Sequence, residues 1–546
     1  LLRRIIAMSF LYKSKLTFLP LILTSFVIGV ILPSWLSDDC LSMKLIAYKL
    51  NLHESIQFYF DEPAYSSVNV SGDQPTIHMP ITSPVASTVT LTSQPPYKQG
   101  QTVLGTIVSK DDNSVPTNHG GDIYTVRVVF PNFDNSFAVQ PIDHNNGTYS
   151  FFVPLFWAGI VRIEVELILA SAAASYAKTL LDTEFVISQW TNEAVFKNNQ
   201  MKETVLCNFD WTLNQDYCDL TIYNGMIPWY CPKPSRLPCE SFTYNQPRIK
   251  LPSDYKHFSR LLSKQYGNTE VKLPVLELNV TLIEDFEFPK PPTAAEVGVS
   301  DIGPRGYFNK GHWVSLLHQN NRSEIGDVIV CIMNKHFLLF GDGNTQFPKD
   351  LFHNRLTDFD VIDLSEKNAM FYPRLNTTIQ HFGHGHPISQ FDSGFIFSVD
   401  EVFSRPREEV DVIIIDLWAD FIFFHSDKLL LKFLQLRSYL LQWKGKYPDV
   451  EVFLRSPYLR NTPHWSHEPI TFNNYNVKEA NRVFKLVFKD TPFHVMDMWE
   501  MCVAFRDQHD VNPPPEVVGE TLQQVVNVIC PKIQNWPFPL GDLYNK

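Results

Sequence analysis

The chain has 546 residues, more than one globular domain usually needs, so we expect two or three folded units. Hydrophobic residues make up 44% of it and aromatic residues 13%, which is enough to build sizeable cores. With 46 basic and 58 acidic residues, the formal net charge is −12. Proteins that bind nucleic acids usually carry a basic excess or a basic stripe. The sequence shows neither, so we expect no nucleic-acid partner.

The N-terminal segment has the pattern of a membrane signal. Basic side chains occur within residues 1–15, and residues 16–36 then contain no charge. About 20 apolar residues are enough to cross a bilayer as a helix. Because Asp38 and Asp39 follow this stretch, the N-terminus should face the cytoplasm. We predict a cytoplasmic segment at 1–15 and a signal-anchor helix at 16–36, with a cleaved signal peptide as the alternative. Either interpretation sends the remaining chain into the secretory pathway, as a single-pass type II membrane protein (ER or Golgi lumen, or cell surface) or a secreted protein.

Eight cysteines are too few for a disulfide scaffold but normal for a large luminal protein. Their spacings lack a paired Cys-x-x-Cys, so we expect disulfides and no zinc site. The disulfide candidates are Cys207, Cys218, Cys231, Cys239, Cys502 and Cys530. Asn-x-Ser/Thr sequons, which mark exposed glycosylation sites in a luminal chain, occur at Asn69, Asn146, Asn279, Asn321 and Asn376. We expect a glycoprotein without metal or cofactor.

Taken in chain order, the pattern of polar and apolar residues changes several times. Residues 37–80 show no clear period and are typical of a stem or linker. Over 81–190, the alternation in STVTLTS, YTVRVVF and IVRIEVELIL predicts an antiparallel β-sandwich. A cysteine-containing extension (191–284) and a proline-bearing linker (285–300) follow.

The last part of the chain, 301–546, has an α/β pattern. HFLLFGD and DVIIIDLW are nearly continuous apolar runs, typical of parallel strands covered on both faces. Residues 426–445 predict a helix, with Ser426 able to cap its start and Gly445 its end, and PPEVVGETLQQVVNVIC predicts a helix near the C-terminus. Strands that alternate with helices indicate a three-layer domain.

Both halves resemble a known family. GGDIYTVRVVF, DHNNGTYSFFVPLFWAGIVRIEVELI and the cysteine-bearing stretch after Cys207 are similar to the neurexophilin-type sandwich, which has an Ig/filamin-like form. The later motifs, in order, resemble a PC-esterase module of the SGNH/GDSL hydrolase-like superfamily: GYFNKGHWVSL, HFLLFGDGNTQF, DLWADF, VFLR and DVNPPPEVV. Together they resemble the neurexophilin and PC-esterase domain (NXPE) family. The implied fold class is α+β multidomain, with an Ig/filamin-like antiparallel β-sandwich followed by an SGNH-like α/β three-layer domain.

The resemblance implies a Gly-Asp-Ser turn whose serine attacks, and a later histidine, preceded by an aspartate, that takes the serine proton. In this chain Gly343 occupies the serine position and Asn512 the histidine position, while Asp342 and Asp510 are retained. Asp420 stands where relatives are expected to have a histidine. Glycine has no nucleophile, and an amide cannot act as a general base near neutral pH. We therefore expect these positions to be vestigial, although an Asp-Gly pair is also an ordinary turn in which the aspartate hydrogen-bonds its own backbone.

Substitute groups can be proposed but are weak. Thr345 carries a hydroxyl two residues beyond the serine position, where it would point off the turn. His509, paired with Asp507, could replace the missing base but still lacks a serine. The resemblance also places His318 where a cysteine is expected, which would leave Cys331 without its partner.

The expected function is therefore binding without catalysis: a pseudoenzyme whose partner is a glycan or an extracellular glycoprotein, attached to the membrane by its N-terminal anchor. The alternative is a carbohydrate O-acetyltransferase or acetylesterase of the SGNH type with a non-standard site. The glycine-rich loop HFGHGHP is expected to face solvent or carbohydrate rather than to hold a metal. The candidate ligand-binding residues are Gly343, Asn344, Arg455, His384 and His386.

Overall fold

The computed structural model describes residues 81–530 with internal gaps at 132–133, 184–189, 209–215, 222–228, 250–271, 285–303, 317–324, 357–358, 365–367, 385–398, 404–409, 423, 461–472 and 506–511. All described residues belong to one compact unit, Met79–Lys546. The predicted segments 1–15, 16–36 and 37–80 lie outside them, as do Asn69 and Asn321. Within the described part of the chain, no helix is long and apolar enough to cross a membrane.

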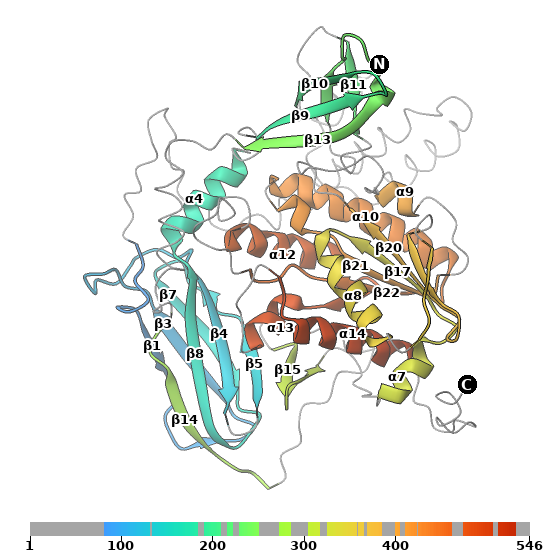
Figure 1. The fold of residues 1–546 in the computed structure, drawn as a ribbon. Coiled ribbons are helices and arrows are strands. Elements are labelled where there is room, and N and C mark those ends of the chain that lie inside the picture. The colour runs from blue at the N-terminus through green and yellow to red at the C-terminus, as the bar shows by residue number, and fades with distance from the viewer. Residues whose placement is uncertain are drawn as a thin grey trace, which may run out of the picture. The chain divides into compact units, whose positions relative to one another are not determined.

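Two β-sheets pack face to face in the N-terminal half (Figure 1). Successive side chains of a strand point to opposite faces of its sheet, and this explains the packing. In β3, Val103 and Ile107 point into the shared core, as do Val126 and Val128 of β4. The smaller sheet has the order β1-β3-β7-β6 and the larger one β16-β15-β5-β4-β8-β14-β2. The pairs are antiparallel except for β14 with β2. The strands are β1 (Thr88–Leu91), β2 (Tyr97–Lys98), β3 (Thr102–Val108), β4 (Ile123–Phe130), β5 (Asn135–Val139), β6 (Ile142–Asp143), β7 (Thr148–Pro154), β8 (Gly159–Leu169), β14 (Leu276–Thr281), β15 (Gly306–Asn309) and β16 (His312–Ser315).

The larger sheet recruits strands from distant parts of the sequence. Strand β14 pairs with β8 although both disulfides of the extension lie between them in the sequence, and the β15–β16 hairpin adds to β5. The predicted antiparallel strands are therefore present, whereas their Ig/filamin-like topology stays a prediction.

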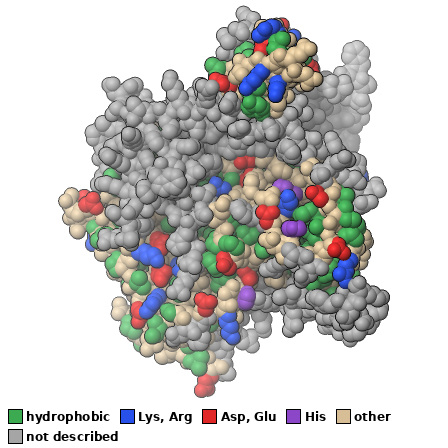
Figure 2. Space-filling view, in the orientation of Figure 1, with side chains coloured by type: hydrophobic (Ala, Val, Ile, Leu, Met, Phe, Trp, Pro, Cys, Tyr) green, Lys and Arg blue, Asp and Glu red, His purple; other side chains and the backbone are tan. Residues whose placement is uncertain are grey.

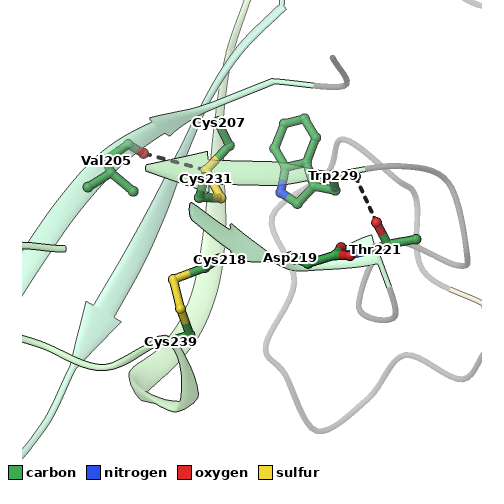
Figure 3. The surroundings of a disulfide bond; sticks show 8 residues. All are labelled: Val205, Cys207, Cys218, Asp219, Thr221, Trp229, Cys231 and Cys239. Atoms are coloured by element: carbon green, nitrogen blue, oxygen red, sulfur yellow. Dashed lines mark hydrogen bonds between the residues drawn. A yellow bond between two sulfur atoms is a disulfide. The ribbon is translucent and has the colours of Figure 1, made fainter. Parts of the chain in front are cut away.

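Two disulfides brace the extension (Figure 3). Cys207 pairs with Cys231, and Cys218 pairs with Cys239. The buried indole of Trp229 lies beside the first bond. The elements here are α4 (Ser171–Asp182), β9 (Trp190–Lys197), β10 (Lys202–Cys207), β11 (Tyr217–Asp219), β12 (Tyr230–Pro232), the 3₁₀ helix η2 (Cys239–Ser241) and β13 (Phe242–Ile249). The prediction that these four cysteines form disulfides is confirmed.

Two expectations about the remaining cysteines are wrong. Cys331 does have a partner, because it forms a disulfide with Cys530. Cys502 keeps a reduced, buried thiol instead of joining a disulfide, and burial raises the pKa of this thiol to about 12. The disulfides indicate an extracellular or secretory-pathway location.

The C-terminal half is built on a sheet of order β18-β19-β20-β17-β21-β22-β23. From β20 to β23 all neighbours are parallel, and β18 and β19 add an antiparallel edge. The strands are β17 (His336–Gly341), β18 (Ile362–Leu364), β19 (Ala369–Tyr372), β20 (Thr377–Gly383), β21 (Val412–Asp416), β22 (Glu451–Arg455) and β23 (His494–Met496). The central strands β17 and β21 are buried almost throughout, as their continuous apolar runs predict.

Helices cover both faces of this sheet (Figure 1). One face packs Phe337 and Leu339 against α8 and α14, and on the other Phe340 contacts Phe403 of α9, which contacts Trp443 of α10. The helices are α7 (Ile325–Ile332), α8 (Gln346–Arg355), α9 (Val399–Phe403), α10 (Ser426–Lys446), α12 (Asn474–Phe488), α13 (Met498–Ala504) and α14 (Pro515–Ile529). The predicted caps of α10 are wrong: His425 precedes the helix and caps it, and Gly445 lies inside it.

Candidate functional site

The order of the parallel strands fixes where a ligand would bind. Strand β17 comes first in the sequence, β20 second and β21 third, yet β17 lies between the other two. The chain thus runs from β17 to β20 on one side of β17, and it later forms β21 on the other side. In open α/β sheets, ligands bind in the crevice at the carboxyl ends of the strands on either side of this reversal. At that edge β17 ends at Gly341 and β21 at Asp416.

Gly341 is required by close approach of the neighbouring strand. A Cβ atom at this position would overlap the backbone carbonyl of Asp416. The amide of Asp342 donates to that same carbonyl oxygen at 3.0 Å. The glycine therefore lets the chain leave β17 in contact with the end of β21, and a sharp turn follows.

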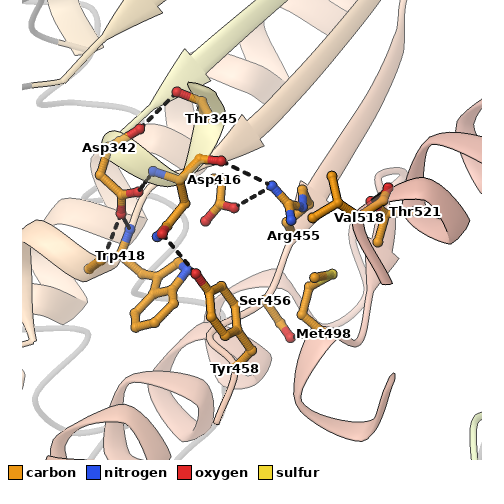
Figure 4. Close-up of polar contacts among 12 residues, drawn as sticks. Asp342, Thr345, Asp416, Trp418, Arg455, Ser456, Tyr458, Met498, Val518 and Thr521 are labelled. Atoms are coloured by element: carbon orange, nitrogen blue, oxygen red, sulfur yellow. Dashed lines mark hydrogen bonds and ion pairs between the residues drawn. The ribbon is translucent and has the colours of Figure 1, made fainter. Parts of the chain in front are cut away.

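Asp342 ties the two turns together (Figure 4). One of its carboxylate oxygens accepts a hydrogen bond from the Asn344 amide at 2.9 Å. The other accepts from the backbone N–H groups of Trp418 at 3.1 Å and Ala419 at 2.6 Å. Burial raises the pKa of Asp342, and these three donors oppose the shift. The expectation that Asp342 serves its own turn is confirmed, and the residue also anchors the turn after β21.

Gly343 is the exposed tip of this turn. A Cβ atom built on it would meet no other heavy atom within 4 Å. It begins a short 3₁₀ helix, η3 (Gly343–Thr345), that leads into α8. A strand that delivers one exposed residue to the start of a helix is how a nucleophilic serine is mounted in hydrolases of this architecture. Here that residue has no side chain, although there is room for one.

Asn344, next to the tip, is held from below by the segment after β22. Its side-chain oxygen accepts from the Tyr458 hydroxyl at 2.7 Å and from Arg460 at 3.3 Å. Its carbonyl lies 3.5 Å from an Arg455 nitrogen. Arg460 also lies over the Trp418 ring, with its guanidinium carbon 4.7 Å from the ring centroid. The exposed tip is thus supported by a buried network of hydrogen bonds and a cation–π contact.

Arg455 is part of that base. Its side chain is 1% exposed and pairs with the fully buried Asp416 at 2.7 Å (Figure 4). Burial raises the pKa of Asp416 to about 7, and the guanidinium opposes the shift. The contacts of Asn344 and Arg455 described here are with the protein itself, so both residues support the tip from within.

Asp420 and His384 lie together near the same edge. His384 follows β20 and Asp420 lies on the 3₁₀ helix η5 (Ala419–Phe421) after β21. A His384 ring nitrogen is 3.8 Å from an Asp420 oxygen, and both residues are buried. Burial, and then the nearby Asp342 charge, raise the pKa of Asp420 well above its ordinary value.

Thr345 makes a contact that bears on the alternative nucleophile. Its hydroxyl lies 2.8 Å from His381 and 2.8 Å from the carbonyl oxygen of Asp342. Burial lowers the pKa of His381 to about 4, with Lys349 adding to the shift, so the imidazole is neutral at pH 7. Thr345, however, has no exposed surface. Its hydroxyl faces the interior.

The segment expected to complete a triad is described only in part. Asn512 lies in a bend before α14 and is exposed. Asp510, His509 and Asp507 lie outside the described residues, as do His318 and His386. Val518 and Thr521 of α14 lie beside Arg455 in Figure 4, so the helix that follows Asn512 approaches the base of the turn.

Sequence reasoning missed several members of this site. Asp416, Trp418, Tyr458 and Arg460 were not singled out, yet they hold Asp342, Asn344 or Arg455. A usable signal existed, because each of them lies within a few residues of the carboxyl end of a buried strand, where ligand-site residues of α/β sheets gather.

Charge distribution and exposed sequons characterise the surface of the described residues. Acidic and basic side chains are interspersed on the face in Figure 2, and no large single-charge patch is visible among its coloured residues. Of the sequon asparagines, Asn146, Asn279 and Asn376 are described, and all three are exposed. Within the described residues, no group of three or more His, Cys, Asp or Glu side chains is placed to hold a metal ion.

The fold and site define a protein that joins paired β-sheets to a doubly wound α/β domain. Two family models match the chain: one described as Neurexophilin at residues 73–262 and one described as NXPE family member 4-like, C-terminal domain, at residues 313–530. The chain belongs to the NXPE family. Among solved structures, a GDSL-like lipase from Bacteroides ovatus matches at 9% identity with a TM-score of 0.21, covering 79% of this chain and 85% of that one. A TM-score this low does not establish a shared fold.

Proposed function

We propose that the α/β domain is an SGNH-like module that binds its ligand at the Gly343 turn without forming a covalent intermediate. The observation that carries this proposal is the contrast at the turn. The tip is exposed and open but bears no hydroxyl, whereas the groups that shape it, Asp342 and Asn344, are kept in buried hydrogen bonds. The N–H groups of Asp342, Asn344 and Thr345 donate within the protein. The N–H of Gly343, at the tip, is therefore the donor that we propose for a carbonyl or an anion. Gly343, the exposed tip, has no side-chain atom that can attack.

The ligand class we propose is a glycan or a glycoprotein. It is supported by the disulfides and exposed sequons, which belong to a secretory environment. Membrane attachment through residues 16–36 is part of the same proposal.

Two experiments test it. A fluorophosphonate probe, which labels activated serines, should leave the purified luminal part of the chain unlabelled, whereas labelling at one discrete residue would contradict the proposal. On a glycan array, saturable binding should be lost on Gly343→Phe, which fills the turn. Gly445→Phe is the matched control, because Gly445 is also exposed and also has no neighbour within 4 Å of a Cβ atom. Absence of binding by the unmodified protein, or equal loss in both variants, would rule out the turn as the binding site.

The alternative is an O-acetyltransferase or acetylesterase. The contact that favours it is the Thr345 hydroxyl, 2.8 Å from a neutral His381. The burial of Thr345 speaks against it, because an acyl donor could not reach the hydroxyl. Turnover of an aryl acetate that disappears in both Thr345→Val and His381→Ala would establish this function. A double change, Gly343→Ser with Asn512→His, should instead create labelling by the probe if the turn keeps its hydrolase-like shape.

A further inference from the structure

The segment after β22 contacts two regions at once. Tyr458 and Arg460 face the turn and hold the side-chain oxygen of Asn344. Leu459, between them, packs away from the turn on a cluster formed by Ile123 and the residues Ile168, Leu169, Ala173 and Ala174. Those residues belong to β4, β8 and α4, that is, to the paired-sheet region and the helix that leaves it. One three-residue stretch therefore links the N-terminal region to the base of the Gly343 turn.

A second element reinforces this link. Tyr475, in the first turn of α12, packs on the same cluster as Leu459. Its neighbour Asn474 binds the backbone of Arg460 twice: its oxygen accepts from the Arg460 amide at 3.0 Å, and its nitrogen donates to the Arg460 carbonyl at 2.7 Å. The backbone that carries Arg460 is thus clamped by α12, and both rest on α4 and the ends of β4 and β8.

Other contacts join the two regions elsewhere. The carbonyl oxygen of Ala504, at the end of α13, accepts from Ser136 of β5 at 2.7 Å and from Arg127 of β4 at 3.1 Å. Loss of the Leu459 contact would therefore loosen the segment after β22 without separating the regions.

We propose that Leu459 is a positioning residue for the Gly343 turn, and that the N-terminal region is consequently a structural part of the candidate site. Each residue in this series holds the next one in place. Packing of Leu459 on the cluster that includes Ala173 and Ala174 of α4 fixes the backbone of Tyr458 and Arg460. The side chains of these two residues hold Asn344. Asn344 in turn holds the turn that presents Gly343. Any partner of the N-terminal region that shifts α4 is then coupled to the turn. This extends the proposed binding function, but the packing claim does not depend on the identity of the ligand.

Hydrogen–deuterium exchange on the luminal part of the chain tests the proposal without a ligand. The informative amides are those of Asn344 and Thr345, which donate within the turn to the side chain and the carbonyl of Asp342. In Leu459→Ala, their exchange should quicken by about tenfold, as expected when a local opening becomes easier. The conservative variant Leu459→Met should restore most of the protection. The matched control is Leu441→Ala on the exposed side of α10, which should leave the turn unchanged.

The same experiment contains the result that would overturn the proposal. Strands β3 and β7, which contribute no residue to the cluster on which Leu459 packs, report the stability of the N-terminal region. If exchange in Leu459→Ala rises equally in these strands and in the turn, or not at all in the turn, Leu459 has no positioning role. Ala174→Leu, which adds bulk to the cluster from the α4 side, should quicken exchange at the turn in the same way, and it provides the test if Leu459→Ala does not fold. Failure of glycan binding would contradict the proposed function but leave this result standing.

Discussion

Two buried aspartates, one in each half of the protein, organise distant backbone in the same manner but with different outcomes. In the N-terminal half, Asp122 accepts from the Ser171 amide at 2.7 Å and from the Ser109 hydroxyl at 2.7 Å. Ser109 in turn lies 2.8 Å from the Tyr124 hydroxyl. All of these partners are buried. Asp342 likewise gathers backbone N–H groups from two turns, but the turn it shapes ends at Gly343, an exposed residue with room for a side chain.

The difference separates a structural network from a candidate site. Both aspartates satisfy backbone donors that would otherwise be buried without partners. Only the second network lies at the carboxyl ends of parallel strands and supports an open surface position.

The largest expected effect comes from the Arg455–Asp416 ion pair at the base of the Gly343 turn. The contacts of Asp122 described above include no such cation. Arg455→Ala leaves Asp416 buried without its cation and should lower the free energy of unfolding by about 3–5 kcal/mol. Urea unfolding followed by tryptophan fluorescence measures it. Arg455→Met combined with Asp416→Leu should recover most of the loss, since replacement of a whole buried pair by apolar groups is often neutral. If the single variant is as stable as the parent, the pair is not buried as described.

Two neighbouring glycines give the next largest effect and sharpen the contrast between scaffold and tip. Gly341→Ala should lower stability by about 1–3 kcal/mol, because its Cβ atom overlaps the Asp416 carbonyl. Gly343→Ala should change it by less than about 0.5 kcal/mol, because its Cβ atom meets nothing. Thermal unfolding of the pair measures both, and equal losses would mean that the tip is packed against another part of the protein.

The two aspartates can be compared directly. Asp342→Asn and Asp122→Asn should each cost about 1–2 kcal/mol, because a carboxylate that accepts from several donors is replaced by a weaker acceptor. Only Asp342→Asn should also weaken ligand binding at the turn. The measurement is binding on the glycan array alongside urea midpoints, and a loss of binding in Asp122→Asn at unchanged fold would erase the distinction drawn above.

The dependence of stability on pH concerns a further carboxyl group, that of Glu500. Burial, and then the charge of Asp497, raise the pKa of Glu500 to about 8. The folded chain therefore holds a proton on Glu500 that the unfolded chain releases near the ordinary pKa of a glutamate. Between the ordinary glutamate pKa of about 4.3 and the raised value of about 8, the free energy of unfolding therefore falls as the pH rises, by at most about 1.4 kcal/mol per pH unit.

Glu500→Gln removes that proton equilibrium while keeping an acceptor for the Arg305 amide. Between pH 6 and 8, the variant should lose less stability than the parent. Unfolding midpoints measured across this range decide the matter, with Glu240→Gln, in the distant extension, as control. Parallel slopes for parent and Glu500→Gln would show that Glu500 ionises in the folded chain at an ordinary pH.

The sequence predicted the local part of the site and not its long-range part. The apolar run before Gly341 predicted a buried strand, and the Asp-Gly pair predicted a turn that Asp342 would hold through its own backbone. Both are local consequences of side-chain period and turn chemistry. By contrast, the contact of Tyr458 with Asn344 joins residues 114 positions apart.

The Cys331–Cys530 disulfide, with a sequence separation of 199, was missed for the same reason. The resemblance left Cys331 without a partner, and Cys502 was predicted as a disulfide candidate although its thiol is reduced. Which cysteine lies opposite another depends on how α7 and α14 pack on one face of the sheet, and no spacing rule within a single sequence contains that information.

The recruitment of β14 by β8 has a consequence for synthesis. The chain leaves the ribosome from its N-terminus, so β8 is made long before β14, and the two disulfide-bonded pairs Cys207–Cys231 and Cys218–Cys239 lie between them in the sequence. Until β14 arrives, the outer edge of β8 presents unpaired backbone N–H and C=O groups, which is the condition that invites pairing with other chains. The nascent protein is therefore most exposed to aggregation while the extension is being translated, and chaperones of the secretory pathway would be needed most in that interval.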